Sequence, residues 1–176
     1  MPKKINALRE KLLTCAREIL VGRGYSELTI RAIATECGVV PGTIYNYFPS
    51  KEKLVESVML EDWRARRAML DVKMQEAGSA LEAIRVLAEA LDSFVESYHE
   101  IWEKHPATMN DSSTFRKHHK QIVAQMCGML QPIMEKYDCM FHPVLPQFLA
   151  EALLVLAADE DKHFESVEPI LRKLLD

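Results

Sequence analysis

Hydroxyl groups and a lysine are concentrated between residues 43 and 51 of this 176-residue chain. Thr43, Tyr45 and Tyr47 supply three hydroxyl groups, and Lys51 follows them with a positive charge. Side-chain hydroxyls donate hydrogen bonds to the phosphates of a nucleic acid and set the protein's register on it. A lysine in the first turn of a helix adds its charge to free backbone N–H groups that also favour a phosphate. The spacing therefore indicates a surface that binds phosphate.

A helix-turn-helix pattern is predicted to position these residues. Between residues 30 and 37, apolar side chains recur at i, i+3, i+4 and i+7, which predicts a helix. Gly38 then permits a sharp turn. Pro41 starts a third, very short helix, whose inner side Ile44 and Phe48 anchor one turn apart. Three short helices with a glycine turn between the second and the third are the plan of a helix-turn-helix.

The rest of the chain repeats the period of amphipathic helices, and no segment alternates as a strand does. Thr29, Ser50 and Ser79 are predicted N-caps, and Ser79 forms a capping box with Glu82. Pro132 is expected to bend or shorten the helix that contains it. The predicted fold class is therefore all-α.

The composition is that of a folded chain, with 48% hydrophobic and 27% charged residues. No apolar run reaches the roughly 18 residues that a transmembrane helix needs, so no membrane contact is predicted. Residues 1–11 lack the apolar core of a signal peptide, which favours a cytoplasmic protein. Residues 1–51 contain eight Lys and Arg against four Glu, a net charge of +4, although the whole chain carries −4. This asymmetry fits a polyanion-binding head on an acidic body.

The sequence contains little that indicates a metal site, a cofactor site or an enzyme active site. Cys15, Cys37, Cys127 and Cys139 include no CxxC pair, which favours reduced, buried thiols, with a zinc site or a redox switch as the alternatives. The histidines show no HExxH spacing, so neither a metal nor a cofactor is predicted. GxSxG, P-loop and GxGxxG motifs are also absent. We therefore predict no catalytic residue and no enzymatic activity.

Residues 29–54 read TIRAIATECGVVPGTIYNYFPSKEKL and closely resemble the N-terminal signature of the TetR family of transcriptional regulators. The resemblance covers roughly residues 5 to 60, and it is specific because glycines, a threonine, aromatic residues and a lysine stand at set spacings. It implies an all-α homodimer of about nine helices per subunit, with a three-helix helix-turn-helix domain at 1–50 and an effector-binding and dimerisation domain at 51–176. A repressor that leaves a palindromic DNA operator when a small hydrophobic effector binds is the implied function.

The resemblance also implies which residues contact double-stranded DNA. These ten positions are Thr29, Arg31, Val40, Pro41, Gly42, Thr43, Tyr45, Asn46, Tyr47 and Lys51. The hydroxyl-bearing residues of the third helix and the lysine hold phosphates, while the residues around Gly42 and Asn46 face bases. Val40 and Pro41 replace a polar or basic pair often found in the family, which predicts apolar contact with a thymine methyl group. Asn46 is then the main hydrogen-bonding reader, with adenine as its natural partner.

The helices after the helix-turn-helix supply candidates for an effector pocket and for a dimer interface. Aromatic and methionine side chains suggest a hydrophobic pocket, at Trp63, Phe94, Tyr98, Trp102, Phe115, Met126 and Met129. For each of them the alternative is an ordinary core position. The last two helices carry more apolar residues than one subunit needs, at Phe148, Leu149, Ala152, Leu153, Leu156, Ile170, Leu171 and Leu174.

Two alternative hypotheses keep the predicted fold but change the mode of regulation. In the first the chain is a transcriptional activator, and in the second it is a DNA-binding protein that no ligand regulates. The sequence fits a repressor, an activator and a DNA-binding protein without a ligand equally well.

Overall fold

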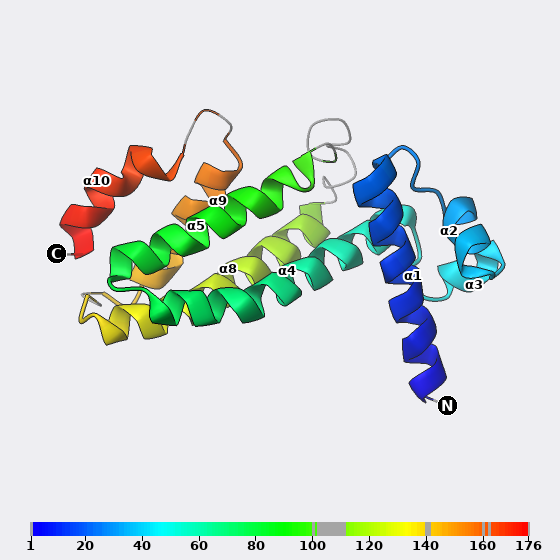
Figure 1. The fold of residues 1–176 in the computed structure, drawn as a ribbon, viewed down its shortest axis with the longest axis horizontal. Coiled ribbons are helices and arrows are strands. Elements are labelled where there is room, and N and C mark those ends of the chain that lie inside the picture. The colour runs from blue at the N-terminus through cyan, green and yellow to red at the C-terminus, as the bar shows by residue number, and fades with distance from the viewer. Residues whose placement is uncertain are drawn as a thin grey trace. The chain divides into compact units, whose positions relative to one another are not determined.

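The computed structural model describes residues 2–99, 101, 112–139, 142–159, 161 and 163–175, with the side chains of all of these except 2–6 and 112–118. Over these residues the chain forms helices and no strand, which confirms the predicted all-α fold (Figure 1). The eight described helices are α1 (Pro2–Arg23), α2 (Ile30–Cys37), α3 (Pro41–Tyr45), α4 (Lys51–Glu76), α5 (Ala80–Glu96), α8 (Ser112–Lys136), α9 (Leu145–Ala157) and α10 (Phe164–Leu175).

The chain divides into two compact units, and the division falls inside α4. Described residues up to Arg64 belong to the first unit, and Ala65–His99 with the described residues from Ser112 onward belong to the second. The predicted functional boundary at residue 50 stays a prediction, because compactness does not locate a functional boundary. None of the described helices combines the length and the apolarity that crossing a bilayer requires.

The first unit packs α1 against α2 and α2 against α3. Its core is a set of fully buried aliphatic side chains, including Leu12, Leu13, Ile19, Leu28, Ile33, Ile44 and Leu54. Two ion pairs join α1 to the first part of α4 within this unit: Arg9 to Glu61 at 2.7 Å and Arg17 to Asp62 at 2.5 Å. The short helices α2 and α3 therefore lie on a framework made by longer elements.

Local capping fixes where α2 begins and ends. Thr29 Oγ1 accepts a hydrogen bond from the Ala32 N–H at 3.1 Å, which confirms the predicted N-cap. Gly38 adopts the left-handed conformation, with φ of 68°, and its N–H bonds to the carbonyl groups that end the helix. Ser50 Oγ accepts from the Lys53 N–H at 3.3 Å, as expected of a cap at the start of α4.

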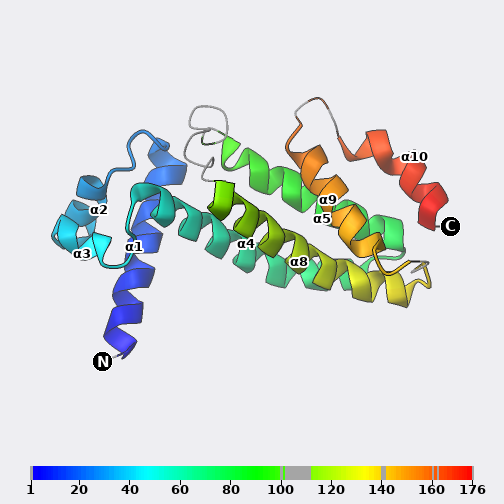
Figure 2. The same ribbon diagram turned by 180° about the vertical axis from the view of Figure 1, so that it is seen from behind.

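The second unit packs α5 against α8, α9 and α10, and α9 also against α8; Figure 2 shows α9 beside α5 and α8. The predicted capping box is present, since Ser79 Oγ accepts from the Glu82 N–H at 3.1 Å and Glu82 Oε2 accepts from the Gly78 N–H at 2.7 Å. Arg85 pairs with Glu165 at 3.0 Å and Glu168 at 2.5 Å, which holds α10 against α5.

Pro132 does not end α8, contrary to one of the two outcomes expected of it. The helix continues past this residue to Lys136. Pro132 is exposed, so water can reach the backbone carbonyl group that the proline leaves without a donor. Ile133 and Met134 are fully buried directly after it. Their burial stabilises the last turn against the lost hydrogen bond.

Candidate nucleic-acid interface and effector cavity

Residues 40–48, which include α3 and are called the α3 turn below, expose most of the predicted contact residues and bury the side chains that fix the helix to the core. Val40 is 68% exposed and Tyr45 is 52% exposed, whereas Ile44 and Phe48 are 0% and 3% exposed. This separation follows from helical geometry, because Ile44 and Phe48 lie one turn apart on the same face. The guanidinium of Arg9 lies 5.5 Å from the centre of the Phe48 ring and covers this anchor.

None of the ten predicted DNA-contact residues lies in the core. Seven are exposed: Thr29, Arg31, Val40, Pro41, Gly42, Tyr45 and Asn46. The other three, Thr43, Tyr47 and Lys51, are half-buried. Pro41 is the first residue of α3, where its ring presets the helical backbone angle and its missing N–H costs no bond. The backbone of this helix start is thus preset by Pro41, and the outer side chains are accessible.

Thr29 and Arg31 differ in how free their polar groups are. The Thr29 oxygen already accepts the capping bond from Ala32, which leaves its hydroxyl hydrogen available to a phosphate. Arg31 is exposed, and among the described residues no ion pair involves its guanidinium. Arg31 therefore has all its donors available to a polyanion.

Lys51 has a structural contact that the sequence pattern did not reveal. Its Nζ donates a hydrogen bond to the Tyr25 carbonyl group at 2.7 Å and lies 3.5 Å from the centre of the Tyr25 ring. Burial lowers the pKa of Lys51 below its ordinary value, while the neighbouring Glu52 carboxylate acts in the opposite direction. An ammonium group has three donors, so this contact positions the charge and leaves donors for a phosphate.

Part of the positive charge in the first 51 residues is neutralised inside the first unit. Three of the eight basic residues form ion pairs there: Arg9 with Glu61, Arg17 with Asp62 and Arg23 with Glu36. Lys11 donates to the Cys37 carbonyl group at 3.0 Å and so has a structural role as well. Because Glu61 and Asp62 lie outside residues 1–51, the net charge of this segment overstates the charge that is available to DNA.

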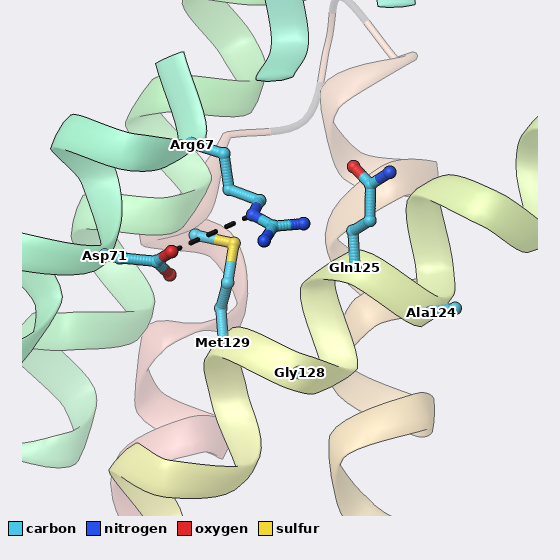
Figure 3. Close-up of a pocket in the computed structure, with 6 residues that line it drawn as sticks. All are labelled: Arg67, Asp71, Ala124, Gln125, Gly128 and Met129. Atoms are coloured by element: carbon cyan, nitrogen blue, oxygen red, sulfur yellow. Dashed lines mark ion pairs between the residues drawn. The ribbon is translucent and has the colours of Figure 1, made fainter. Parts of the chain in front are cut away.

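A cavity of about 260 Å³ lies in the second unit between α4 and α8 (Figure 3). It is lined by Arg67, Asp71, Ala124, Gln125, Gly128 and Met129. Arg67 Nε lies 3.8 Å from Asp71 Oδ2, a long separation for an ion pair one helical turn apart. Gln125 Oε1 is buried and has no hydrogen-bond partner among the described residues. The cavity is therefore more polar than the sequence led us to expect.

Of the five predicted pocket residues whose side chains the structure describes, only Met129 lines this cavity. Trp63, Phe94, Tyr98 and Met126 are buried core residues, and the rings of Phe94 and Tyr98 pack edge to face at 5.2 Å. Trp63 also belongs to the first unit. Trp102 and the side chain of Phe115 lie outside the described residues. The polar lining was missed, although small residues four apart on one helix, as at 124 and 128, are a signal of an open space.

The predicted dimer residues divide into two groups. Leu149, Leu153 and Leu171 are 1%, 2% and 6% exposed, so these three pack within their own unit. Phe148 and Ile170 are 60% and 65% exposed. Ala152, Leu156 and Leu174 are half-buried. Val155, 64% exposed, was not predicted and adds to the apolar surface of α9.

The cysteines are unpaired, and three of the four are buried: Cys15, Cys37 and Cys139. Burial, together with a hydrogen bond to Glu36, raises the pKa of Cys15 to about 12. A thiol of this kind is not ionised at neutral pH and is a poor nucleophile. Among the described residues, no group of three or more His, Cys, Asp or Glu side chains is placed to hold a metal ion.

Comparisons with known proteins agree with this geometry. Residues 12–58 match the family model described as bacterial regulatory proteins, tetR family. The regulator UidR of Escherichia coli K12 is 30% identical over 100 residues, which cover 57% of this chain and 47% of UidR. The chain thus spans about half the length of the curated relatives it matches.

Solved structures extend the similarity in fold to nearly the whole chain. A putative TetR-family regulator from Rhodococcus sp. has a TM-score of 0.63 at 14% identity, over 96% of this chain and 98% of that one. The regulator FadR of Bacillus subtilis, in complex with stearoyl-CoA, has a TM-score of 0.60 at 16% identity, over 95% of this chain and 97% of that one. The chain therefore shares the fold of these solved regulators, and its residues 12–58 match the model of the tetR family of bacterial regulatory proteins.

Proposed function

We propose that the chain is a sequence-specific DNA-binding transcriptional regulator that acts as a homodimer. One observation carries the proposal: the segment that matches the tetR family model contains α3 with its predicted contact residues accessible on the outer side. The proposed regulator works where its operator lies, which implies a cytoplasmic location. We propose no enzymatic activity, because the family that it matches consists of regulatory proteins.

In the proposed complex, α3 lies in the major groove of the operator. The methyl groups of Val40 contact a thymine methyl, and Asn46 pairs with adenine through its amide. The hydroxyl groups of Tyr45 and Tyr47 donate to phosphates and set the register of the helix. Lys51, held by Tyr25, adds a positive charge close to the same phosphates. Base preference then depends on residues 40–46, while affinity depends on the phosphate contacts.

Two copies meet through the exposed apolar residues of α9 and α10 in this proposal. Phe148, Val155 and Ile170 are each at least 60% exposed, and large apolar side chains so exposed are candidates for an interface. A two-fold dimer places two recognition helices on an inverted repeat, with half-sites about 34–36 Å apart or further. The operator is therefore expected to be palindromic.

Repression is the proposed mode, with release when a small molecule occupies the second unit. α4 has residues in both units, from Lys51 to Glu76, and it carries two of the residues that line the cavity. A ligand that prefers one conformation of α4 shifts the population of dimers that fit the operator. A difference of about 1–3 kcal/mol between the two states is a typical coupling energy.

Selection from a pool of random double-stranded DNA tests the proposed function directly. The purified full chain, at about 100 mM salt, should enrich one inverted repeat. Asn46→Ala should relax the preference at one position of each half-site, whereas Tyr47→Phe should keep the same sequence and bind it more weakly. A pool in which no sequence becomes enriched would contradict the proposal.

A further inference from the structure

We propose that Tyr25 is a positioning residue for DNA binding, because it holds the ammonium group of Lys51 ready for a phosphate of the operator. This role rests on the proposed function, since it adds a supporting residue to the proposed DNA-contact surface. Tyr25 lies in the connection between α1 and α2, outside the ten predicted contact residues, and it is only 4% exposed. A residue so deeply buried does not contact DNA itself, so its effect on affinity passes through Lys51.

The backbone after α1 fixes the place of Tyr25. Gly24 adopts a positive φ of 89°, which glycine takes without strain, and its N–H bonds to the Leu20 carbonyl group at 3.2 Å. The chain then turns inward, so that the Tyr25 ring joins the core of the first unit. The Tyr25 carbonyl group accepts a hydrogen bond from the Leu28 N–H at 3.2 Å. The ring and the carbonyl group are therefore both held in place by the fold.

Two contacts with Tyr25 hold the Lys51 ammonium group. Its Nζ donates to the Tyr25 carbonyl group at 2.7 Å and lies 3.5 Å from the centre of the Tyr25 ring, whose face attracts a cation. The burial that lowers the pKa of Lys51 also means that the ammonium group has lost part of its water in the free protein. A lysine that is ordered and partly desolvated in advance loses less freedom and less water when it meets a phosphate.

The positive charge of Lys51 is held but not neutralised. Among the described residues, no carboxylate forms an ion pair with Lys51, and its side chain is half-buried, so part of it is accessible. The adjacent carboxylate of Glu52 accepts hydrogen bonds from the Ser50 hydroxyl and from its own backbone N–H. Lys51 is the first residue of α4 and follows the α3 turn by three residues. The supported charge therefore lies close in sequence to the hydroxyl groups that are proposed to hold phosphates.

A change in the electrostatics of the ring alone tests this role. Tyr25→Phe keeps the ring and the carbonyl group, and should bind the selected DNA site as the wild type does. Pentafluorophenylalanine at position 25 has nearly the shape of phenylalanine, but its ring face no longer attracts a cation. It should weaken DNA binding about 3-fold or more relative to Tyr25→Phe. Tyr25→Leu, which removes the ring, should give a loss in the same direction. Circular dichroism confirms that each variant is folded.

A double-mutant cycle separates positioning from a purely structural effect. In a Lys51→Ala background the fluorinated ring should no longer affect DNA binding, because the group that it positions is absent. Arg31→Ala is the matched control background, since Arg31 is another exposed cation of the first unit and has no contact with Tyr25; there the effect of the ring should persist. Lys51→Ala should also lower the slope of log affinity against log salt by about 1, whereas the fluorinated variant, which keeps the charge, should not.

The titrations that complete this cycle use the full chain and fluorescence anisotropy on the selected DNA site, and they distinguish failure of this role from failure of the proposed function. An equal loss in the Lys51→Ala and Arg31→Ala backgrounds would show that Tyr25 is only structural. Tighter binding by the fluorinated variant would show that Tyr25 withholds Lys51 from the phosphate. Either result overturns the role of Tyr25 and leaves the regulator intact. A wild-type chain that enriches no DNA site overturns the proposed function, and the role of Tyr25 with it.

Discussion

The two units of the chain reach their folds in different ways. In the first, single residues decide the structure: Thr29 caps α2, Gly38 takes a left-handed conformation, and Pro41 begins α3. In the second, helices such as α5 follow a broad amphipathic pattern, in which many apolar residues serve equally well. The first unit therefore tolerates few substitutions at its turns, whereas the second tolerates many.

The comparisons with known proteins follow the same division. The family model matches residues 12–58 only, yet the fold of FadR aligns with 95% of the chain at 16% identity. A helical scaffold that keeps its fold while its sequence changes is free to vary the residues that line its cavity. The difference between the units teaches that single positions specify the first unit, whereas an overall apolar pattern specifies the second.

The largest expected effect is a core truncation in the first unit. Ile44 is the fully buried residue of α3, so Ile44→Ala should lower the free energy of unfolding by about 2–5 kcal/mol. Val72→Ala, at a position 56% exposed in the second unit, should change the stability by less than about 0.5 kcal/mol. Urea denaturation followed by circular dichroism measures both. Similar losses in the two variants would contradict the assigned burial.

A charge on the exposed surface of α9 should affect assembly alone. Phe148→Glu should raise the dissociation constant of the proposed dimer by about 30-fold or more, because the truncation of an interface hot spot costs about 2 kcal/mol. Val40→Glu is the matched control, since Val40 is similarly exposed but lies in the first unit. Analytical ultracentrifugation measures the dimer. The contrast fails if the Val40 variant dissociates and the Phe148 variant does not.

Two glycines should respond to alanine with opposite signs. Gly38→Ala should destabilise the chain by about 1–2 kcal/mol, because its φ of 68° is unfavourable for a residue with a Cβ. Gly128→Ala should stabilise the chain by roughly 0.5–1 kcal/mol, since Gly128 lies inside α8 with open space around its Cβ position. Thermal unfolding checks both signs. A stabilising Gly38→Ala would refute the local account of the α2–α3 turn.

The smallest expected effects concern two carboxyl groups whose pKa values are shifted in opposite directions. Hydrogen bonds from the Ser50 hydroxyl and from its own backbone N–H lower the pKa of Glu52, so its contribution is present above about pH 4.5 and is lost as the pH falls through the lowered value. Burial raises the pKa of Asp92, although His163 opposes the shift, so its contribution is largest at low pH and decreases as the pH rises through the raised value.

Glu52→Gln should therefore flatten the loss of stability between about pH 5 and pH 3, whereas Asp92→Asn should steepen it. Each effect should stay below about 1 kcal/mol, because solvent screens groups at the surface. Urea denaturation at several pH values gives the two slopes. Slopes that change in the same direction would refute the opposite signs assigned to the two groups.

The sequence predicted the first unit better than the second for a physical reason. Caps, a left-handed glycine and an N-terminal proline act within a few residues, so their consequences can be derived from sequence spacing. The contact between Lys51 and Tyr25 joins residues 26 apart, and no local pattern indicates it. The caps and the turn before α3 were therefore predictable, but not the support behind Lys51.

The sequence predicted the helices of the second unit, but not which of their side chains are exposed. α9 is apolar on nearly every side, so spacing alone does not say that Leu149 and Leu153 face their own unit while Phe148 and Val155 face outward. The cavity was missed because Arg67 and Gln125 come from separate helices and meet only through packing. Large aromatic residues, which the sequence favoured as pocket lining, instead fill the core.

The most direct test of the account is the affinity of the selected DNA site for variants of the α3 surface, measured by fluorescence anisotropy at fixed salt. Tyr45→Phe/Tyr47→Phe removes only two hydroxyl groups and should weaken binding by about 10-fold or more without a change in melting temperature. Tyr47→Ala/Lys51→Ala should weaken it about 100-fold or more. Lys73→Ala, an exposed change in the second unit, should bind as the wild type does. Folded α3 variants with wild-type affinity would contradict the central claim that residues 40–51 hold the operator.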